Sequence, residues 1–266
     1  MHIADPFIAR AAPLVEETLT QLTASAFPLL KPIRHGLLGG KRLRPLLTLA
    51  VVDTYDAPLE RALIPAAALE LIHTYSLIHD DLPCMDNDDL RRGKPTLHKA
   101  FSESTAVLTG DALLTYAFEV LANAPHLTDS EKVALTSILA TRSGMAGMIG
   151  GQVLDIAHMG KFESLASLTE THQKKTGALI TAALEFGAIL ADQPLEPLQN
   201  LGAHLGLAYQ VVDDLLDGDG AAELLGIEEA REWAHALHDQ AIKAIEPAPL
   251  LEELVSHLIF KRLNSE

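Results

Sequence analysis

The stretch IPAAALELIHTYSLIHDDLPCMDNDDLRRG, residues 64–93, joins an apolar segment with helical spacing to a dense group of charges. Pro83 ends the regular helix, because its ring blocks the hydrogen bond to the residue four positions before it. Two like charges about 4 Å apart repel by roughly 4 kcal/mol at an effective dielectric near 20, so crowded carboxylates need cations. Five carboxylates lie within ten residues here: Asp80, Asp81, Asp86, Asp88 and Asp89.

The rest of the chain also favours helices. Ala and Leu dominate, β-branched runs are scarce, and apolar residues recur three and four positions apart, as in residues 107–118. No linker or change in composition divides the sequence. We therefore expect an all-α fold, a helical bundle of about ten or more helices around a central cavity, with residues 1–266 as a single domain. Pro, Gly and Asp predict breaks near residues 27–28, 56–58, 92–95, 124–125, 192–194, 217–220 and 247–249.

The composition limits the partners and the compartment. The 266 residues carry 36 acidic side chains against 20 Lys and Arg, and this net charge of −16 argues against nucleic acid as a partner. Cys84 is the only cysteine, so no disulfide can form within the chain. The start of the sequence lacks a signal-peptide pattern, and its most apolar run, residues 178–191, contains Glu185 and is too short for a membrane span. We expect a cytoplasmic protein with no membrane span.

A second acidic cluster lies in YQVVDDLLD, residues 209–217. Gln210, Asp213, Asp214 and Asp217 fall at i, i+3, i+4 and i+7, so a helix would present them as one polar stripe. The surrounding residues are apolar, and carboxylates on a buried stripe need compensating cations. Like the first cluster, this second cluster therefore needs cations nearby.

Oxygen ligands from two such clusters suit a hard cation. The break at Pro83 could turn Asp86 back towards the side of Asp80. Mg²⁺ typically uses one or two carboxylates together with substrate phosphates. A solvated helix face is the ordinary explanation of one acidic run, but it fits poorly with two clusters that both lie in apolar helices.

Basic residues stand next to these acids in the sequence. Arg91 and Arg92 follow the first cluster, and arginine can grip phosphate through two hydrogen bonds. Further bases occur in GGKRLRP, residues 39–45, and in HQKKTG, residues 172–177. The pattern predicts carboxylates that hold Mg²⁺, Mg²⁺ that holds a polyphosphate, and arginines that hold the rest of it.

Glycines at helical spacing in residues 144–151 predict either close backbone packing or the approach of a bulky group, because glycine costs about 1 kcal/mol in a helix interior.

Together these segments resemble the trans-isoprenyl diphosphate synthases, most closely the bacterial members that make farnesyl diphosphate. The motifs occur in the order GGKRLRP, DDLPCMDNDDLRRG, GMIGGQVLD, HQKKTGALI and LGLAYQVVDDLLD, from about residue 30 to about residue 240. The resemblance implies an all-α homodimer whose helices surround a deep cavity. Two aspartate motifs would face each other across it and hold three Mg²⁺ ions on an allylic diphosphate.

The resemblance also assigns roles by position. The metal ligands would be Asp80, Asp81, Asp86, Asp213, Asp214 and Asp217. The pocket for isopentenyl diphosphate would contain Lys41, Arg44, His73 and Arg92. The residues at the allylic diphosphate would be Arg91, Lys175, Thr176 and Gln210, and the last three would also serve catalysis, Thr176 and Gln210 by stabilising the developing allylic cation. Tyr75, with Ser76 beside it, would limit product length to fifteen carbons.

The implied reaction condenses isopentenyl diphosphate with dimethylallyl or geranyl diphosphate to give farnesyl diphosphate. Mg²⁺ and the bases would neutralise the leaving diphosphate, the allylic C–O bond would ionise, and the isopentenyl double bond would attack before a proton is lost. Geranylgeranyl diphosphate synthesis, a non-catalytic synthase-like subunit and terpene cyclisation are the alternatives. The set of Lys41, Arg44 and His73 argues against a cyclase, which needs no isopentenyl pocket.

One segment departs from the family. Its members continue past the second aspartate motif with a Gly-Lys pair and a Lys-x-Thr-Tyr-Pro segment, whose lysines close over the diphosphates. Here LLDGDG runs directly into AAELLGIEEAREWA. We expect a lysine-bearing loop in the real polypeptide between about Asp217 and Leu224, or else a protein that lacks this lid.

Overall fold

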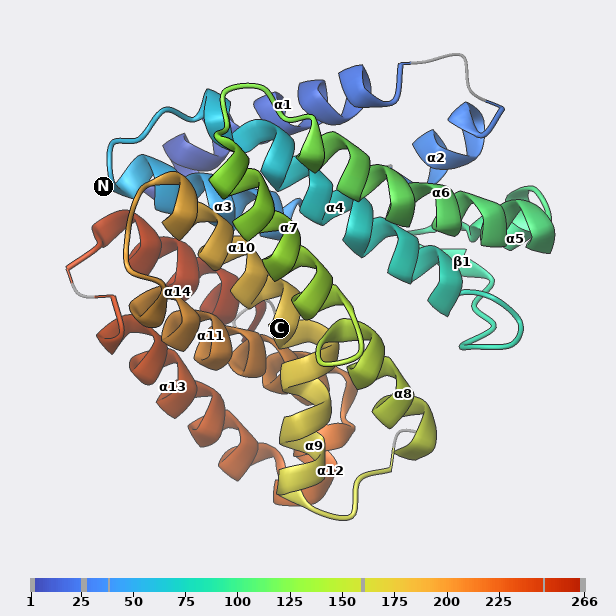
Figure 1. Ribbon diagram of the computed structural model, residues 1–266. Coiled ribbons are helices and arrows are strands. Elements are labelled where there is room, and N and C mark those ends of the chain that lie inside the picture. The colour runs from blue at the N-terminus through green and yellow to red at the C-terminus, as the bar shows by residue number, and fades with distance from the viewer. Residues whose placement is uncertain (1–2, 25–27, 38, 159–160, 246, 264–266) are drawn as a thin grey trace.

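The computed structural model describes residues 3–24, 28–37, 39–158, 161–245 and 247–263, and these are helical almost throughout (Figure 1). This confirms the expected all-α class. A π-helical turn, η1 (Gln173–Gly177), joins two helices into one continuous rod, and a short antiparallel hairpin pairs β1 (Leu90–Arg91) with β2 (Lys94–Pro95). The helices are α1 (Ala4–Leu22), α2 (Leu30–Leu37), α3 (Leu43–Thr54), α4 (Glu60–Asp80), α5 (Leu97–Ala100), α6 (Glu103–Ala122), α7 (Asp129–Ser143), α8 (Met148–His158), α9 (Leu165–His172), α10 (Ala178–Leu190), α11 (Leu195–Asp217), α12 (Gly220–Leu225), α13 (Ile227–Lys243) and α14 (Pro249–Leu263).

Helix α10 forms the centre of the bundle. It is buried along nearly all its length, and α3, α4, α7 and α11 pack around it. Outside this centre, α4 pairs with α6, and α11 pairs with α13. The buried apolar side chains form one continuous core. Because α4 and α11 both contact α10, their acidic C-terminal ends are held on one rigid framework (Figure 1).

The charge inside α10 is compensated by the protein itself. Glu185 is buried, and its carboxylate accepts hydrogen bonds from Arg142 at 2.7 and 2.9 Å and from Gln199 at 2.7 Å. A buried carboxylate without such partners would be strongly destabilising. The acidic residue that interrupts the apolar sequence therefore ties α7 and α11 to α10.

The predicted breaks lie between helices, the one at residues 92–95 falls in the β1–β2 hairpin, and residue 27 lies outside the described residues. Several other breaks were not predicted, and two of them are instructive. A turn at residues 144–147 separates α7 from α8, and Gly226, at φ 82°, separates α12 from α13. The positive φ of Gly226 suits glycine, but nothing in the local apolar spacing marks it as a boundary.

Two long helices are more apolar over their length than the sequence analysis recognised. By length and composition alone, α4 and α6 could each cross a membrane, although residues 178–191 had been singled out as the most apolar run. Two thirds of the apolar window of α4 is buried against other helices, as expected for a core helix, whereas α6 is less covered. Such helices are weak evidence for membrane insertion.

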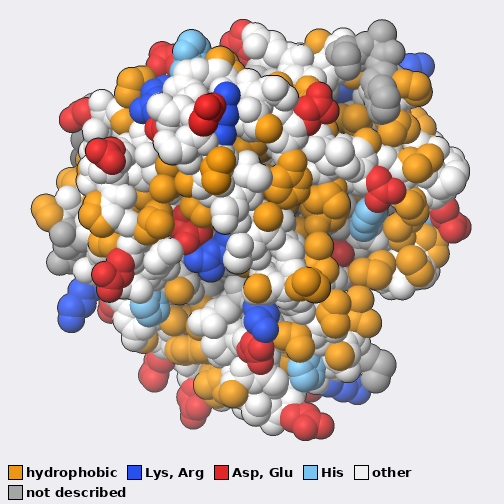
Figure 2. All heavy atoms as spheres, viewed as in Figure 1, with side chains coloured by type: hydrophobic (Ala, Val, Ile, Leu, Met, Phe, Trp, Pro, Cys, Tyr) orange, Lys and Arg blue, Asp and Glu red, His pale blue; other side chains and the backbone are white. Residues whose placement is uncertain are grey.

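Exposed apolar side chains occur on the less covered side of α6 and on α8. Val107 and Leu108 of α6 are exposed, and so are Ile149, Val153 and Ile156, which share one face of α8. Figure 2 shows apolar side chains gathered on the side of the molecule where these two helices lie. We call these five residues the α6–α8 surface.

Close backbone approach fixes how α11 crosses η1 and α10. A Cβ atom added to Gly206 would lie 2.5 Å from the Cα of Gly177, and one added to Gly202 would lie 2.6 Å from Oγ1 of Thr181. Similarly, a Cβ on Gly151 of α8 would lie 2.1 Å from the backbone nitrogen of Lys175. At Gly151 this confirms the packing explanation of the glycine-rich segment, and it places η1 between α8 and α11.

We predict that Gly206→Ala destabilises the protein by about 1–2 kcal/mol, although alanine alone would favour the helix by about 1 kcal/mol. The added methyl group meets backbone rather than a flexible side chain, so η1 and α11 must separate. Urea unfolding provides the measurement, with Ala203→Ser on the exposed side of α11 as a control expected to be nearly neutral. A Gly206→Ala variant as stable as the parent would show that the two backbones have room to spare.

Candidate functional site

The first acidic cluster folds back on itself as the break at Pro83 predicted. Helix α4 ends at Asp80, and the backbone N–H of Asp86 donates to the carbonyl oxygen of Asp80 at 2.9 Å. The turn carries Asp86 to the end of the same helix. Its carboxylate is close enough to Asp80 for the two negative charges to raise the pKa of Asp80.

The outer acids of this cluster are paired with the bases that follow them. Arg91 donates to the buried Asp81 through Nε at 2.9 Å and through a second, shorter hydrogen bond, and also to Asp88 at 3.1 Å. Lys99 forms an ion pair with Asp89 at 2.8 Å. These ion pairs offset the negative charge of Asp81, Asp88 and Asp89. Asp80 and Asp86 have the least direct compensation from arginine.

The hairpin after the cluster separates its two arginines. Its loop residues, Arg92 and Gly93, have φ of 54° and 74°, the combination that a tight two-residue turn requires. Arg91 lies on the strand and reaches Asp81, whereas Arg92 lies in the loop near Gly40, where a Cβ would be 3.0 Å from one of its guanidinium nitrogens. Arg91 therefore contacts the first acidic cluster, whereas Arg92 lies beside the turn that contains Gly40.

Burial raises the pKa of Asp80 to about 6, with Asp86 and Asp81 adding to the shift and Lys175 and Arg91 opposing it. Burial likewise raises the pKa of Asp86, again against the influence of Lys175. The ammonium group of Lys175 donates to Asp155 of α8 at 2.6 Å. Lys175 thus lies among three carboxylates. Asp155 was not assigned a role from sequence, although it ends the motif GMIGGQVLD.

The π-helical turn presents Lys175 and Thr176 towards the acidic ends of α4 and α11. The hydroxyl of Thr176 donates to Oε1 of Gln210 at 2.9 Å. A π-helical turn inside an α-helix is uncommon and often occurs at functional sites. Here the extra residue in the turn lies where the predicted catalytic residues Lys175, Thr176 and Gln210 come together.

A cavity of about 310 Å³ lies between these elements. It brings together the predicted isopentenyl diphosphate residues Lys41, Arg44, His73 and Arg92 with Thr176, Gln210 and Asp213. Sequence reasoning assigned no role to several other lining residues, among them Glu70 and Tyr209. Burial and the neighbouring arginines hold the pKa of His73 well below its usual value, so His73 is a neutral hydrogen-bonding group at neutral pH. The positive charge comes from Lys41 and the arginines.

The three aspartates of the second cluster do not share one environment. Asp213 lines the cavity, and Asp217 is exposed at the end of α11. Asp214 is buried, and its Oδ2 accepts hydrogen bonds from His172 and from the backbone N–H of Ala221, both at 2.8 Å. The predicted single stripe is therefore split, because Asp214 is held by α9 and α12.

The chain continues without interruption where a lid was expected. Within the described segment 161–245, Asp217 leads through Gly218 and Asp219 directly into α12. The expected lysine-bearing loop is therefore not part of this sequence, which contains no lysine from residue 176 to residue 242. Instead, Gly220 packs against the carboxylate of Asp214, only 2.3 Å from where a Cβ would stand.

Tyr75 lies in the core at the inner side of α4. It is buried, its ring contacts His79 edge-on at 5.8 Å, and its hydroxyl has no hydrogen-bond partner in the part of the chain that the structure describes. Burial, with a contribution from Asp80, raises the pKa of Tyr75 to about 12. Ser76 donates to the carbonyl oxygen of His73 at 2.9 Å. The bulky ring lies five residues before Asp80 on α4, and its role in limiting product length stays a prediction.

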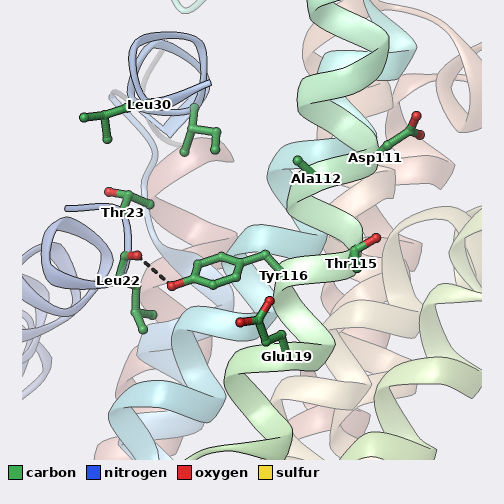
Figure 3. A pocket seen from close by; sticks show the side chains of 9 residues that line it. Leu22, Thr23, Leu30, Asp111, Ala112, Thr115, Tyr116 and Glu119 are labelled. Atoms are coloured by element: carbon green, nitrogen blue, oxygen red, sulfur yellow. Dashed lines mark hydrogen bonds between the residues drawn. The ribbon is translucent and has the colours of Figure 1, made fainter. Parts of the chain in front are cut away.

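A second cavity, about 500 Å³, lies between α1, α2 and α6 (Figure 3). Its lining is mainly apolar, with Asp111 and Glu119 on α6, and the hydroxyl of Tyr116 donates to the carbonyl oxygen of Leu22 at 2.6 Å. None of the predicted site residues lines it. The basic cavity, although smaller, is the one to which the sequence motifs lead.

The acidic clusters fit a hard cation only together with a ligand. Within the described ranges, no group of three or more His, Cys, Asp or Glu side chains forms a ready metal cage. Asp80, which is half-buried, and Asp86, which is exposed, nevertheless offer oxygen donors with raised pKa values, and a bound divalent cation would offset the cause of those shifts. Mg²⁺ needs only one or two carboxylates when phosphates supply further oxygens, so the residues fit a Mg²⁺–diphosphate complex.

Comparison with known proteins supports this arrangement. Residues 28–229 match the family described as polyprenyl synthetase. The chain is 44% identical over 244 residues to farnesyl diphosphate synthase of Escherichia coli, covering 82% of each chain, and 43% identical over 239 residues to a chloroplastic geranylgeranyl pyrophosphate synthase of Capsicum annuum, covering 80% of this chain and 65% of that one.

The fold agrees with the sequence match. A crystal structure of a FPP/GFPP synthase from Zymomonas mobilis superposes with a TM-score of 0.89 at 39% identity, covering 97% of this chain and 100% of the other. The family match spans both acidic clusters and the basic cavity. The chain therefore belongs to the polyprenyl synthetase family.

Proposed function

We propose that the protein is a trans-prenyltransferase that condenses isopentenyl diphosphate with dimethylallyl or geranyl diphosphate to give farnesyl diphosphate. The observation that carries this proposal is the basic cavity, where Lys41, Arg44 and Arg92 meet Thr176, Gln210 and Asp213. An anion-binding cavity beside two carboxylate clusters suits two diphosphates, one held by bases and one held through a cation. The relatives named farnesyl diphosphate synthase support the fifteen-carbon product.

Isopentenyl diphosphate would occupy the cavity itself. Lys41, Arg44 and Arg92 supply positive charge, and neutral His73 supplies a hydrogen bond. Arg44 is buried, and its Nε has no partner in the described part of the chain, which suits a guanidinium group that awaits an anion. No side-chain nucleophile is needed, because the double bond of the substrate attacks.

The allylic diphosphate would lie between the acidic clusters. Asp80, Asp81 and Asp86 from one side and Asp213 and Asp217 from the other would hold Mg²⁺, which supplies Lewis-acid stabilisation of the leaving diphosphate. Asp214 joins this set only if it leaves its contacts with His172 and Ala221. Lys175 and Arg91 would bind the diphosphate oxygens, and Thr176 with Gln210 would face the developing allylic cation. We propose up to three Mg²⁺ ions per site, in keeping with the resemblance.

We further propose a cytoplasmic homodimer in which residues 1–266 act as one domain. The continuous hydrophobic core supports the single domain. The α6–α8 surface supports the dimer, because large exposed apolar patches commonly mark protein interfaces.

A non-catalytic synthase-like subunit is the second candidate. The observation that favours it is the direct passage from Asp217 into α12, which leaves this region without the lysines that close over diphosphates in the family. Geranylgeranyl diphosphate synthesis is the other alternative, and relatives with that name exist.

The deciding experiment is incubation with Mg²⁺, geranyl diphosphate and labelled isopentenyl diphosphate, followed by product analysis. We expect a fifteen-carbon product, and we expect Asp80→Ala or Asp213→Ala to lower turnover by roughly a hundredfold or more with the fold intact. Asp89→Ala is the matched control, because Asp89 is exposed and paired with Lys99. A folded parent protein without turnover would favour the subunit, a twenty-carbon product would favour geranylgeranyl synthesis, and full activity in EDTA would refute the metal assignment.

Asp80 should also make stability depend on pH. Its pKa is about 6 in the folded protein against an ordinary 3.8, so the folded state binds the proton more tightly and stability falls as pH rises from about 4 through about 6. We predict that Asp80→Asn stabilises the metal-free protein at pH 7.5, by at most about 3 kcal/mol before solvent screening reduces the effect.

This gain should disappear near pH 4. Denaturant unfolding in EDTA at both pH values measures it, with Asp111→Asn on exposed α6 as the control. Equal stability of Asp80→Asn and the parent at pH 7.5 would mean that burial and the neighbouring carboxylates do not destabilise the charged form of Asp80.

The length prediction concerns Tyr75. Tyr75→Ala should open space below Asp80 and shift products towards twenty carbons or more, at a stability loss of about 3–5 kcal/mol. Tyr116→Ala removes the same side chain beside the second cavity and should leave product length unchanged (Figure 3). Chromatography measures the chain lengths of the products. An unchanged chain-length distribution in Tyr75→Ala would show that Tyr75 does not limit product length.

A further inference from the structure

Glu70 is a residue that an anion site would not be expected to contain. Its carboxylate is only 2% exposed and lines the basic cavity together with Lys41, Arg44 and Arg92. A negative charge there repels a bound diphosphate, and a buried carboxylate is unfavourable unless it is paired. Glu70 must therefore contribute something that offsets both effects.

The first contribution is an anchor for Arg42. Glu70 accepts a hydrogen bond from Nη1 of Arg42 at 2.9 Å. The same guanidinium group donates to both oxygens of Glu16, at 2.6 and 3.2 Å, and to the carbonyl oxygen of Leu37 at 2.5 Å. With these contacts Arg42 has little capacity left for a ligand, although it reaches the cavity wall. It holds the backbone in place instead.

The backbone that Arg42 holds is the turn that presents the binding residues. Arg42 has a left-handed φ of 53° and immediately precedes α3, in which Arg44 lies. Gly40 lets the guanidinium group of Arg42 approach, because a Cβ there would lie 2.2 Å from Nη1. The contact between Glu70 and Arg42 thus connects α4 to the segment that carries Lys41 and Arg44.

The second contribution is charge. Burial lowers the pKa of Arg44 and of Arg92, and the Glu70 carboxylate opposes that shift at both. Glu70 therefore acts on Arg42, Arg44 and Arg92, three cations that repel one another when no anion is bound. We propose that Glu70 is a built-in counter-ion of the diphosphate cavity: it positions the Arg42 turn when the cavity is empty and limits how tightly the cavity holds an anion.

This inference rests on the proposed function, in which the cavity binds isopentenyl diphosphate. The direct test uses inorganic pyrophosphate in EDTA, so that the aspartate clusters cannot contribute through Mg²⁺. Glu70→Gln should melt several degrees below the parent without ligand, because Arg42 loses the buried one of its two charged partners. It should bind pyrophosphate about tenfold more tightly, because one repelling charge is gone. In turnover assays, its KM for isopentenyl diphosphate should fall while KM for the allylic substrate stays unchanged.

Two variants separate charge from anchoring. Glu16→Gln removes hydrogen bonds from the same Arg42, but the Glu16 side chain is 53% exposed and does not line the cavity, so the melting temperature should fall with pyrophosphate affinity unchanged. Glu70→Asp keeps the charge with a shorter reach, so it too should lose stability without gaining affinity. Arg44→Gln should abolish pyrophosphate binding in the parent and in Glu70→Gln, which locates the anion in this cavity.

The outcomes distinguish failure of the proposed function from failure of the counter-ion proposal. If the parent does not bind pyrophosphate at the Arg44 site, the proposed function loses its anion cavity. If the parent binds but Glu70→Gln binds equally or less tightly, Glu70 is only a structural anchor and the counter-ion proposal fails. Should Glu70→Gln be insoluble alone, purification with pyrophosphate should recover it, and failure to fold even then would likewise overturn the proposal.

Discussion

The structure depends on compensation of charges that lie inside an apolar helical bundle. Guanidinium groups at the start of α3 and in the hairpin share one cavity with Glu70 of α4 and Asp213 of α11, and further carboxylates stand at the end of α4. Each charge removed from water must be matched by another charge or by hydrogen bonds. Several are matched within the protein, as Asp81 is by Arg91 and Glu70 is by Arg42. Asp80 and Arg44 are the least satisfied, and they mark where ligands fit.

Many of the predicted site residues lie where regular helices are interrupted. Pro83 turns the chain so that Asp86 returns to Asp80, the tight turn at Arg92 separates two arginines, and η1 places Lys175 and Thr176 opposite Gln210. The straight helices around α10 give these irregular segments a rigid support. Gly206 and Gly151 then let neighbouring backbones approach η1 closely, which fixes the distance between the two acidic ends.

Much of this arrangement follows from sequence because it depends on local pattern. Apolar spacing predicted the helices, Pro83 predicted the return of Asp86, and the order of the motifs identified the cavity residues. Glu70, Asp155 and Tyr209 were missed because their roles arise from contacts between distant segments. For the same reason, the stripe on α11 did not predict the two contacts of Asp214. Its carboxylate accepts hydrogen bonds from His172 and from the backbone N–H of Ala221 in the first turn of α12. The loop expected after Asp217 came from the family pattern, and this sequence does not contain it.

The central claim is that one chamber holds two diphosphates, one on the bases and one between the aspartates. A crystal structure with Mg²⁺, isopentenyl diphosphate and an unreactive thio analogue of geranyl diphosphate tests it most directly. The account predicts one diphosphate on Lys41, Arg44 and Arg92, and the other linked through Mg²⁺ to Asp80 and Asp213. Diphosphates found elsewhere, or an allylic analogue bound without metal between α1, α2 and α6, would contradict it.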